Sequence, residues 1–81
     1  MEALDAMTKA DKVVDSRGSS YPLLDARKEI MTVPVGGVLE TISSDMDTKD
    51  MVLVWARKVG HEFLGVVPDP RYDRIFVRRL K

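Results

Sequence analysis

The sequence predicts an α+β fold, a two-layer sandwich in which two helices cover one face of a mixed four-stranded sheet. Two observations predict this class. Short apolar or β-branched runs alternate with two segments whose apolar residues recur at helical spacing, which gives the element order β-α-β-α-β-β. Connections between parallel strands are right-handed almost without exception, so both helices are expected on the same face of the sheet.

The first strand and the first helix are predicted over residues 12–34. Residues 12–15 form a short apolar stretch that stops at the turn-forming cluster 16–20. Pro22 suits the first position of a helix. The helix should end before Pro34, because the residue that precedes a proline avoids the α conformation. The residues at helical spacing between the two prolines are Leu23, Ala26, Ile30 and Met31.

The second strand and the second helix follow the turn formed by two glycines. Residues 38–42 are a β-branched run. Asp47 or Thr48 is expected to be the N-cap of the helix, and Gly60 should end it. The apolar stripe of this helix consists of Val52, Trp55, Ala56 and Val59. Trp55 can bury the largest apolar area in the chain, so we expect it to anchor the core.

The last two strands are predicted at residues 63–67 and 72–80. Pro68-Asp69-Pro70 separates them, and the connection is short enough for an antiparallel hairpin. Residues 1–11 have no clear apolar face and are expected to form a flexible tail. Residues 12–81 are therefore expected to be a single domain.

The composition excludes several classes of function. The 13 basic residues balance the 13 acidic ones, so the whole chain has no net attraction to nucleic acid or to an anionic membrane. No apolar run is long enough to span a bilayer, and the first residues lack the pattern of a signal peptide. We therefore expect a cytoplasmic location and no membrane partner. The chain contains no cysteine, which excludes a persulfide, a disulfide and a cysteine-ligated metal.

One segment is more specific than the rest. Residues 15–24, with the sequence DSRGSSYPLL, resemble the signature D-x-R-G-x-x-C-P-x-P of the TusA/SirA-like family of small sulfur-carrier proteins. Trp55 in the second predicted helix and the Gly60-His61 turn also fit the pattern of that family. The resemblance covers residues 11–81 and implies the same β-α-β-α-β-β order.

The sequence departs from the family signature at two positions. Tyr21 stands where the family has its nucleophilic cysteine, and Leu24 replaces the second proline. The resemblance implies that family members carry sulfur as a persulfide on that cysteine and transfer it to partners, for example toward thiolation of transfer RNA. A phenol has a pKa of about 10 and contains no sulfur, so Tyr21 cannot do this. We therefore expect a protein that is not an enzyme and needs no cofactor.

The candidate partner-binding residues are Arg17, Gly18, Tyr21 and Pro22, because they surround the lost cysteine. Arg17 could lie beside the N-terminus of the first helix, where anions bind favourably, or could be a solvated side chain beside a turn glycine. Tyr21 could be a recognition aromatic, since such rings are enriched at interfaces, or could pack on the first helix.

No metal site is predicted. His61 is the only histidine, and a site made of carboxylates alone would be unusual. The spacing of Asp45, Asp47 and Asp50 lacks the glycine and the distal glutamate of an EF-hand loop, so helix capping explains these residues better. No Ser-His-Asp arrangement or phosphate-binding loop is visible either.

The C-terminal strand is basic and gives an alternative function. Arg74, Phe76 and Arg78 share one face of this strand, and Arg79 lies on the other face. Arg74, Arg78 and Arg79 could follow the phosphates of an RNA, or they could be a charged strand edge that prevents aggregation.

Two hypotheses of function follow. The first is a non-catalytic protein-binding or regulatory module linked to a sulfur relay or to RNA modification, with a protein component of such a pathway as its partner. The alternative is an RNA- or ribosome-associated domain that uses the basic C-terminal strand.

Overall fold

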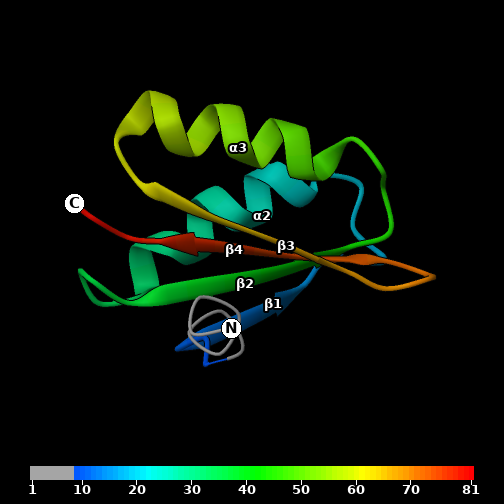
Figure 1. Cartoon of the computed structure of the whole chain (residues 1–81), viewed down its shortest axis with the longest axis horizontal. Coiled ribbons are helices and arrows are strands. Elements are labelled where there is room, and N and C mark those ends of the chain that lie inside the picture. The colour runs from blue at the N-terminus through cyan, green and yellow to red at the C-terminus, as the bar shows by residue number, and fades with distance from the viewer. Residues whose placement is uncertain (1–8) are drawn as a thin grey trace.

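The computed structural model describes residues 9–81, and the remaining residues of the expected N-terminal tail lie outside the described part. The elements run in the predicted order (Figure 1). The strands are β1 (Lys12–Asp15), β2 (Val38–Ser43), β3 (Glu62–Pro68) and β4 (Asp73–Arg78). The helices are α2 (Pro22–Glu29), the short 3₁₀ helix η1 (Ile30–Thr32) and α3 (Thr48–Val59). None of the described helices is long and apolar enough to cross a membrane.

The sheet is mixed and has the strand order β1-β2-β4-β3. β1 pairs with β2 in parallel, while β4 pairs antiparallel with both β2 and β3. The two helices lie side by side over one face of this sheet (Figure 1). The predicted α+β two-layer sandwich, with two helices on one face of a mixed four-stranded sheet, is confirmed. Asp11 precedes β1, and it is joined to Val38 by two hydrogen bonds of 2.7 and 2.8 Å.

The main core lies between the helices and the sheet. It is built from buried aliphatic side chains of both layers: Ala26, Ile30, Val33, Leu39, Val52, Ala56, Ile75 and Val77. A second, smaller cluster contains Val38 and Phe76. Ile75 and Val77 therefore point to the helices, and Phe76 points to the opposite face, as the alternation of a strand requires.

The two helices differ from expectation in which side chains they bury. Val52 and Ala56 are completely buried, whereas Trp55 is only partly buried and packs at the margin of the core. Val59 and Met31, which were expected in apolar stripes, are exposed. Helices that pack closely on a sheet turn small side chains toward it, so the bulky indole lies beside the contact and does not anchor it.

The ends of the helices follow the predicted signals. α2 begins with Pro22 at its first position, and η1 ends before Pro34. Gly60 ends α3 in the left-handed conformation with φ of 89°, which a residue with a Cβ rarely adopts. Asp47 is the N-cap residue of α3, but its side chain makes no capping hydrogen bond.

Candidate functional site

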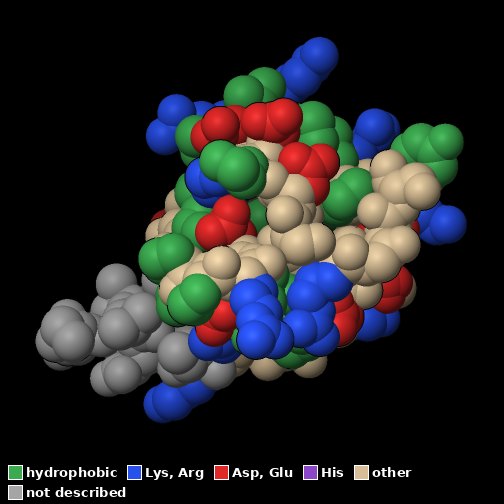
Figure 2. All heavy atoms as spheres, turned by 90° about the vertical axis from the view of Figure 1, so that its right-hand side faces the viewer, with side chains coloured by type: hydrophobic (Ala, Val, Ile, Leu, Met, Phe, Trp, Pro, Cys, Tyr) green, Lys and Arg blue, Asp and Glu red, His purple; other side chains and the backbone are tan. Residues whose placement is uncertain are grey.

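Three loops meet at one end of the sheet. The parallel strands β1 and β2 both end there, so the loop 16–21 before α2 lies beside the loop 44–47 before α3. The β3–β4 turn, residues 69–72, reaches the same end (Figure 1). Figure 2 shows this end of the molecule face on, with basic, acidic and hydrophobic side chains close to one another. The four residues predicted to bind a partner, Arg17, Gly18, Tyr21 and Pro22, all come from the first of these loops and from the start of α2.

Arg17 is held by Asp15 and not by the N-terminus of α2. Its Nη2 and Nε donate to the two carboxylate oxygens of Asp15 at 2.6 and 2.9 Å. The backbone N–H of Arg17 donates to the same carboxylate at 3.1 Å. These hydrogen bonds lower the pKa of Asp15 from 3.8 to about 2, with the side-chain bond as the main cause. Asp15 and Arg17 of the signature segment are thus one structural unit.

The guanidinium of Arg17 also lies over the ring of Tyr72, with its carbon 4.9 Å from the ring centroid. Tyr72 comes from the β3–β4 turn, so this cation–π contact connects the first loop to the last one. The Oγ of Ser44 approaches the carbonyl oxygen of Arg17 at 3.3 Å and connects the middle loop. Both side chains of the Asp15–Arg17 pair remain half exposed, so a partner can reach them.

The rest of the first loop is fixed by short-range hydrogen bonds. Ser16 is buried, and its hydroxyl donates to Asp25 of α2 at 3.0 Å. The N–H of Tyr21 donates to the Oγ of Ser19 at 3.0 Å. The space around Gly18 is open, with no atom within 4 Å of the position that a Cβ would occupy. Nothing inside the chain therefore requires a glycine at position 18.

Tyr21 is the N-cap residue of α2, and its side chain is 69% exposed. Pro22, the first helical residue, is buried beneath it. A groove of about 280 Å³ runs beside the Tyr21 ring. The side chains along this groove are mostly apolar and come from α2, α3 and the loops that precede them: Ser20, Tyr21, Pro22, Leu23, Leu24, Arg27, Asp45 and Met51.

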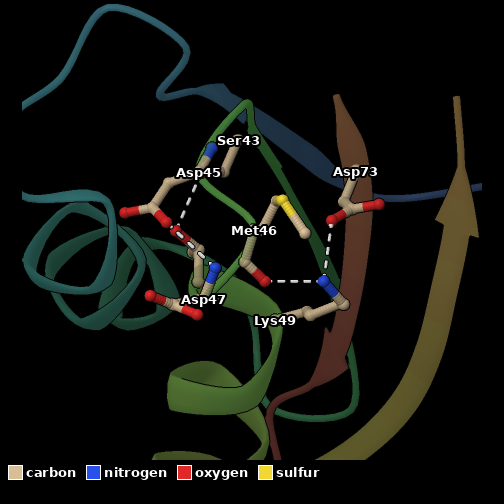
Figure 3. A network of polar contacts seen from close by, with 7 residues as sticks. Ser43, Asp45, Met46, Asp47, Lys49 and Asp73 are labelled. Atoms are coloured by element: carbon tan, nitrogen blue, oxygen red, sulfur yellow. Dashed lines mark hydrogen bonds and ion pairs between the residues drawn. The ribbon is translucent and has the colours of Figure 1, made fainter. Parts of the chain in front are cut away.

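The loop before α3 is held by a network of polar contacts (Figure 3). The carboxylate of Asp45 accepts a hydrogen bond from the N–H of Asp47 at 2.9 Å. Lys49 donates to the carbonyl of Met46 at 2.6 Å and approaches Asp73 at 3.4 Å. Asp45, and not the predicted Asp47, therefore supplies the side-chain acceptor at the start of α3. The residues that the structure describes contain no group of three potential metal ligands.

The three arginines of the basic strand are engaged within the fold. Arg74 makes two hydrogen bonds with the buried carboxylate of Glu40, at 2.7 and 3.3 Å. Arg78 pairs with Glu62 at 3.1 Å. Arg79 lies just after β4, because the strand ends at Arg78 and not at the predicted residue 80, and it donates to the carbonyl oxygens of Val33 and Met31. All three side chains already have acceptors close to them.

His61 lies at the opposite end of α3 from the three loops. Its Nδ1 accepts a hydrogen bond from the N–H of Leu80 at 3.2 Å, and its ring meets that of Trp55 edge to face. Burial lowers the pKa of this imidazole, and the charges of Arg79 and Lys81 lower it further. Through these contacts His61, the only histidine of the sequence, has a structural role beside the C-terminal residues.

The sequence pattern missed Tyr72 as a member of the site. Arg17 and Tyr72 are distant in sequence, and only the hairpin geometry brings them together. A charged residue in the motif loop and an aromatic in the hairpin turn were visible in the sequence, but no spacing rule connects them.

The chain belongs to the TusA family. The family described as "Sulfurtransferase TusA" matches residues 12–79, which is most of the chain. The described fold and the site agree with that assignment, since the loop with Asp15, Arg17 and Gly18 leads directly into α2. The family is one of sulfur carriers, and the sequence of this member has no cysteine.

Curated relatives support the same assignment. A "Putative sulfur carrier protein" of Archaeoglobus fulgidus is 41% identical over 71 residues, which cover 85% of this chain and 97% of the relative. The "Putative sulfur carrier protein YrkF" of Bacillus subtilis is 31% identical over 75 residues, or 90% of this chain, and the match spans 40% of YrkF. The crystal structure of a SirA-like protein from Desulfitobacterium hafniense has the same fold, with a TM-score of 0.73 at 15% identity. That match covers 86% of this chain and 99% of the other.

Proposed function

We propose that this protein is a non-catalytic member of its sulfur-carrier family that binds a protein of a sulfur-relay or RNA-modification pathway. The observation that carries the proposal is the position of Tyr21. Its ring is 69% exposed at the N-cap of α2, where the family signature has the cysteine, in a chain without any thiol. The proposed partner-binding residues are Arg17, Gly18, Tyr21 and Pro22.

The side chains at the end of the sheet where the three loops meet are suited to binding a partner protein. The exposed phenol offers a large apolar face and one hydroxyl, which is the combination enriched at protein interfaces. The apolar groove beside it can receive side chains of a partner. The Asp15–Arg17 pair supplies a preorganised guanidinium in the same loop, because its orientation is already fixed by two hydrogen bonds. The open space at Gly18 lets a partner approach the backbone.

The arrangement explains how such a member could regulate a relay. A partner that recognises the shape of this end would be occupied by a copy that cannot accept sulfur. The result would be competition with sulfur-carrying members of the family for the same partner.

The alternative, RNA binding through the C-terminal strand, has less support. Arg74 and Arg78 already pair with Glu40 and Glu62, so an RNA phosphate would have to displace a carboxylate from each of them. Arg79 is occupied by backbone carbonyls near the end of η1. The ring of Phe76, which lies beside the Arg74 guanidinium, is buried and is not free for base stacking.

The test uses a cysteine desulfurase from the same cell as the probe. The wild-type protein should bind the desulfurase, and Tyr21→Ala or Arg17→Ala should each weaken binding by about tenfold or more, as for interface anchors. Val35→Ala is the control, because Val35 is also exposed but lies in the loop before β2. Isothermal titration calorimetry measures each affinity.

Sulfur transfer is followed in parallel by intact mass after incubation with labelled cysteine. The wild-type chain should gain no sulfur, whereas Tyr21→Cys should gain it if the loop still presents an acceptor to the desulfurase. Covalent sulfur on the wild-type chain would overturn the proposal. So would desulfurase binding that neither Tyr21→Ala nor Arg17→Ala weakens.

A further inference from the structure

The outward face of the helical layer exposes more apolar surface than the packing of one chain requires. On α2 and α3 the side chains that point away from the sheet include several large aliphatic ones: Leu24, Met51, Val54 and Val59. Val54 is 64% exposed in the middle of α3. Exposed apolar residues that gather on one face indicate a surface for association.

A groove follows the line between the two helices on this face. It has a volume of about 320 Å³ and is lined by Leu23, Arg27, Val54, Trp55, Lys58 and Val59. It shares Leu23 and Arg27 with the groove beside Tyr21, so the two grooves lie next to each other. Trp55 is only partly buried because one part of its indole packs on the core and another part lines this groove.

The charges on this face are separated along the helices. Both helices begin at the same end of the molecule (Figure 1). The exposed acids Asp45, Asp47 and Asp50 are at the start of α3, and Figure 2 shows acidic side chains among hydrophobic ones at this end. The exposed bases toward the other end are Lys28, Arg57 and Lys58, whereas Arg27 lies nearer the acidic end and lines the groove beside Tyr21 together with Asp45. Within residues 9–81, none of these seven side chains forms an ion pair with another described residue.

We infer that this face binds a second copy of the same chain, with the helices of the two copies antiparallel about a two-fold axis. A two-fold contact uses the same surface on both copies, so it requires a surface that is complementary to itself. An acidic start and a basic end, with apolar residues between them, meet that requirement when one copy is reversed. The formal net charge of zero adds no overall repulsion between copies.

The first test measures self-association by sedimentation velocity over a range of concentrations. The wild-type chain should shift from monomer to dimer as its concentration rises. Val54→Lys should weaken the dimer by at least about tenfold, because it places a charge in the apolar centre of the contact. Val35→Lys is the matched control, since Val35 is also 64% exposed and lies outside the helical face. Circular dichroism verifies that both variants fold.

The second test reverses the charges at each end of the face. Asp47→Lys with Asp50→Lys, and separately Arg57→Glu with Lys58→Glu, should each abolish the homodimer, because like charges would then meet. An equimolar mixture of these two variants should form a heterodimer, since both ends are again complementary.

A wild-type chain that stays monomeric at all concentrations would overturn the inference, and the face would then be open to an amphipathic segment of another protein. Equal loss of the dimer in Val54→Lys and Val35→Lys would place the contact elsewhere. A mixture of the two charge variants that stays monomeric would rule out the antiparallel arrangement.

Discussion

At the scale of single residues, the site depends on one arginine with two different neighbours. Asp15 fixes the direction of the Arg17 guanidinium, and Tyr72 covers one of its faces. The pair is exposed, so its contribution to stability is small, as for most surface ion pairs. Its effect is on geometry, because it holds the loop 16–21 against the hairpin turn and fixes the position of the guanidinium there.

The pKa of Asp15 provides a direct test of this geometry. In the wild-type protein the carboxyl should titrate at about 2, below its ordinary value of 3.8, because Arg17 donates to the ionised form. A lowered pKa means that the ionised carboxylate favours the folded state above pH 3.8, and that this effect is lost as the pH falls toward 2. Carbon-detected NMR of the side-chain carboxyl measures the titration.

The substitution Arg17→Ala should raise the pKa of Asp15 toward its ordinary value, because the side-chain hydrogen bond and the charge are lost while the backbone N–H of residue 17 still donates to the carboxylate. Tyr72→Leu is the control, since it removes the ring but keeps both side-chain hydrogen bonds between Arg17 and Asp15. A wild-type Asp15 that titrates at 3.8 would show that the pair does not persist in solution.

At the scale of elements, the helices were predictable but their rotation was not. The spacing of Val52, Ala56 and Ile30 indicated helices, and all three are buried. The expectation that Trp55 anchors the core followed from its size, yet a helix packed on a sheet directs small side chains inward. Local sequence patterns were limited in the same way at the site. The family signature placed Tyr21 at the start of α2, but it could not indicate the contact of Arg17 with Tyr72. Contacts across the fold depend on register and rotation, which local patterns do not encode.

Two substitutions test whether Ile75 or Trp55 contributes more to the stability of the core. Ile75→Ala should lower the free energy of unfolding by about 2–5 kcal/mol, because Ile75 is almost completely buried between the sheet and the helices. Trp55→Ala should cost about 1–3 kcal/mol, since only part of its surface is removed from water. Urea unfolding followed by far-ultraviolet circular dichroism measures both. A larger loss for Trp55→Ala than for Ile75→Ala would mean that the indole anchors the core after all.

At the scale of the whole molecule, charge is distributed so that the two faces differ. On the face of the sheet opposite the helices, Arg74 and Arg78 are neutralised by Glu40 and Glu62. On the helical face, the acids and bases stand at opposite ends and are not paired with one another. The charges at the two ends of the helical face are therefore available to a partner, whereas Arg74 and Arg78 already have carboxylate partners. This difference could not be predicted from the sequence, because pairing across strands depends on the register of β2, β3 and β4.

The whole-molecule argument predicts how the protein responds to RNA. Binding of a single-stranded RNA to the wild-type chain through β4 should be weak and should change little with salt, because Arg74 and Arg78 are already paired with carboxylates. The double change Glu40→Gln with Glu62→Gln releases Arg74 and Arg78, and it should steepen the dependence of log affinity on log salt by roughly two phosphate contacts. Fluorescence anisotropy at several salt concentrations measures both slopes, and circular dichroism checks the fold of the variant. Strong, salt-sensitive binding by the wild-type chain that disappears in Arg74→Gln with Arg78→Gln would instead favour the RNA-binding alternative, because the arginines would then exchange their carboxylate partners for phosphates.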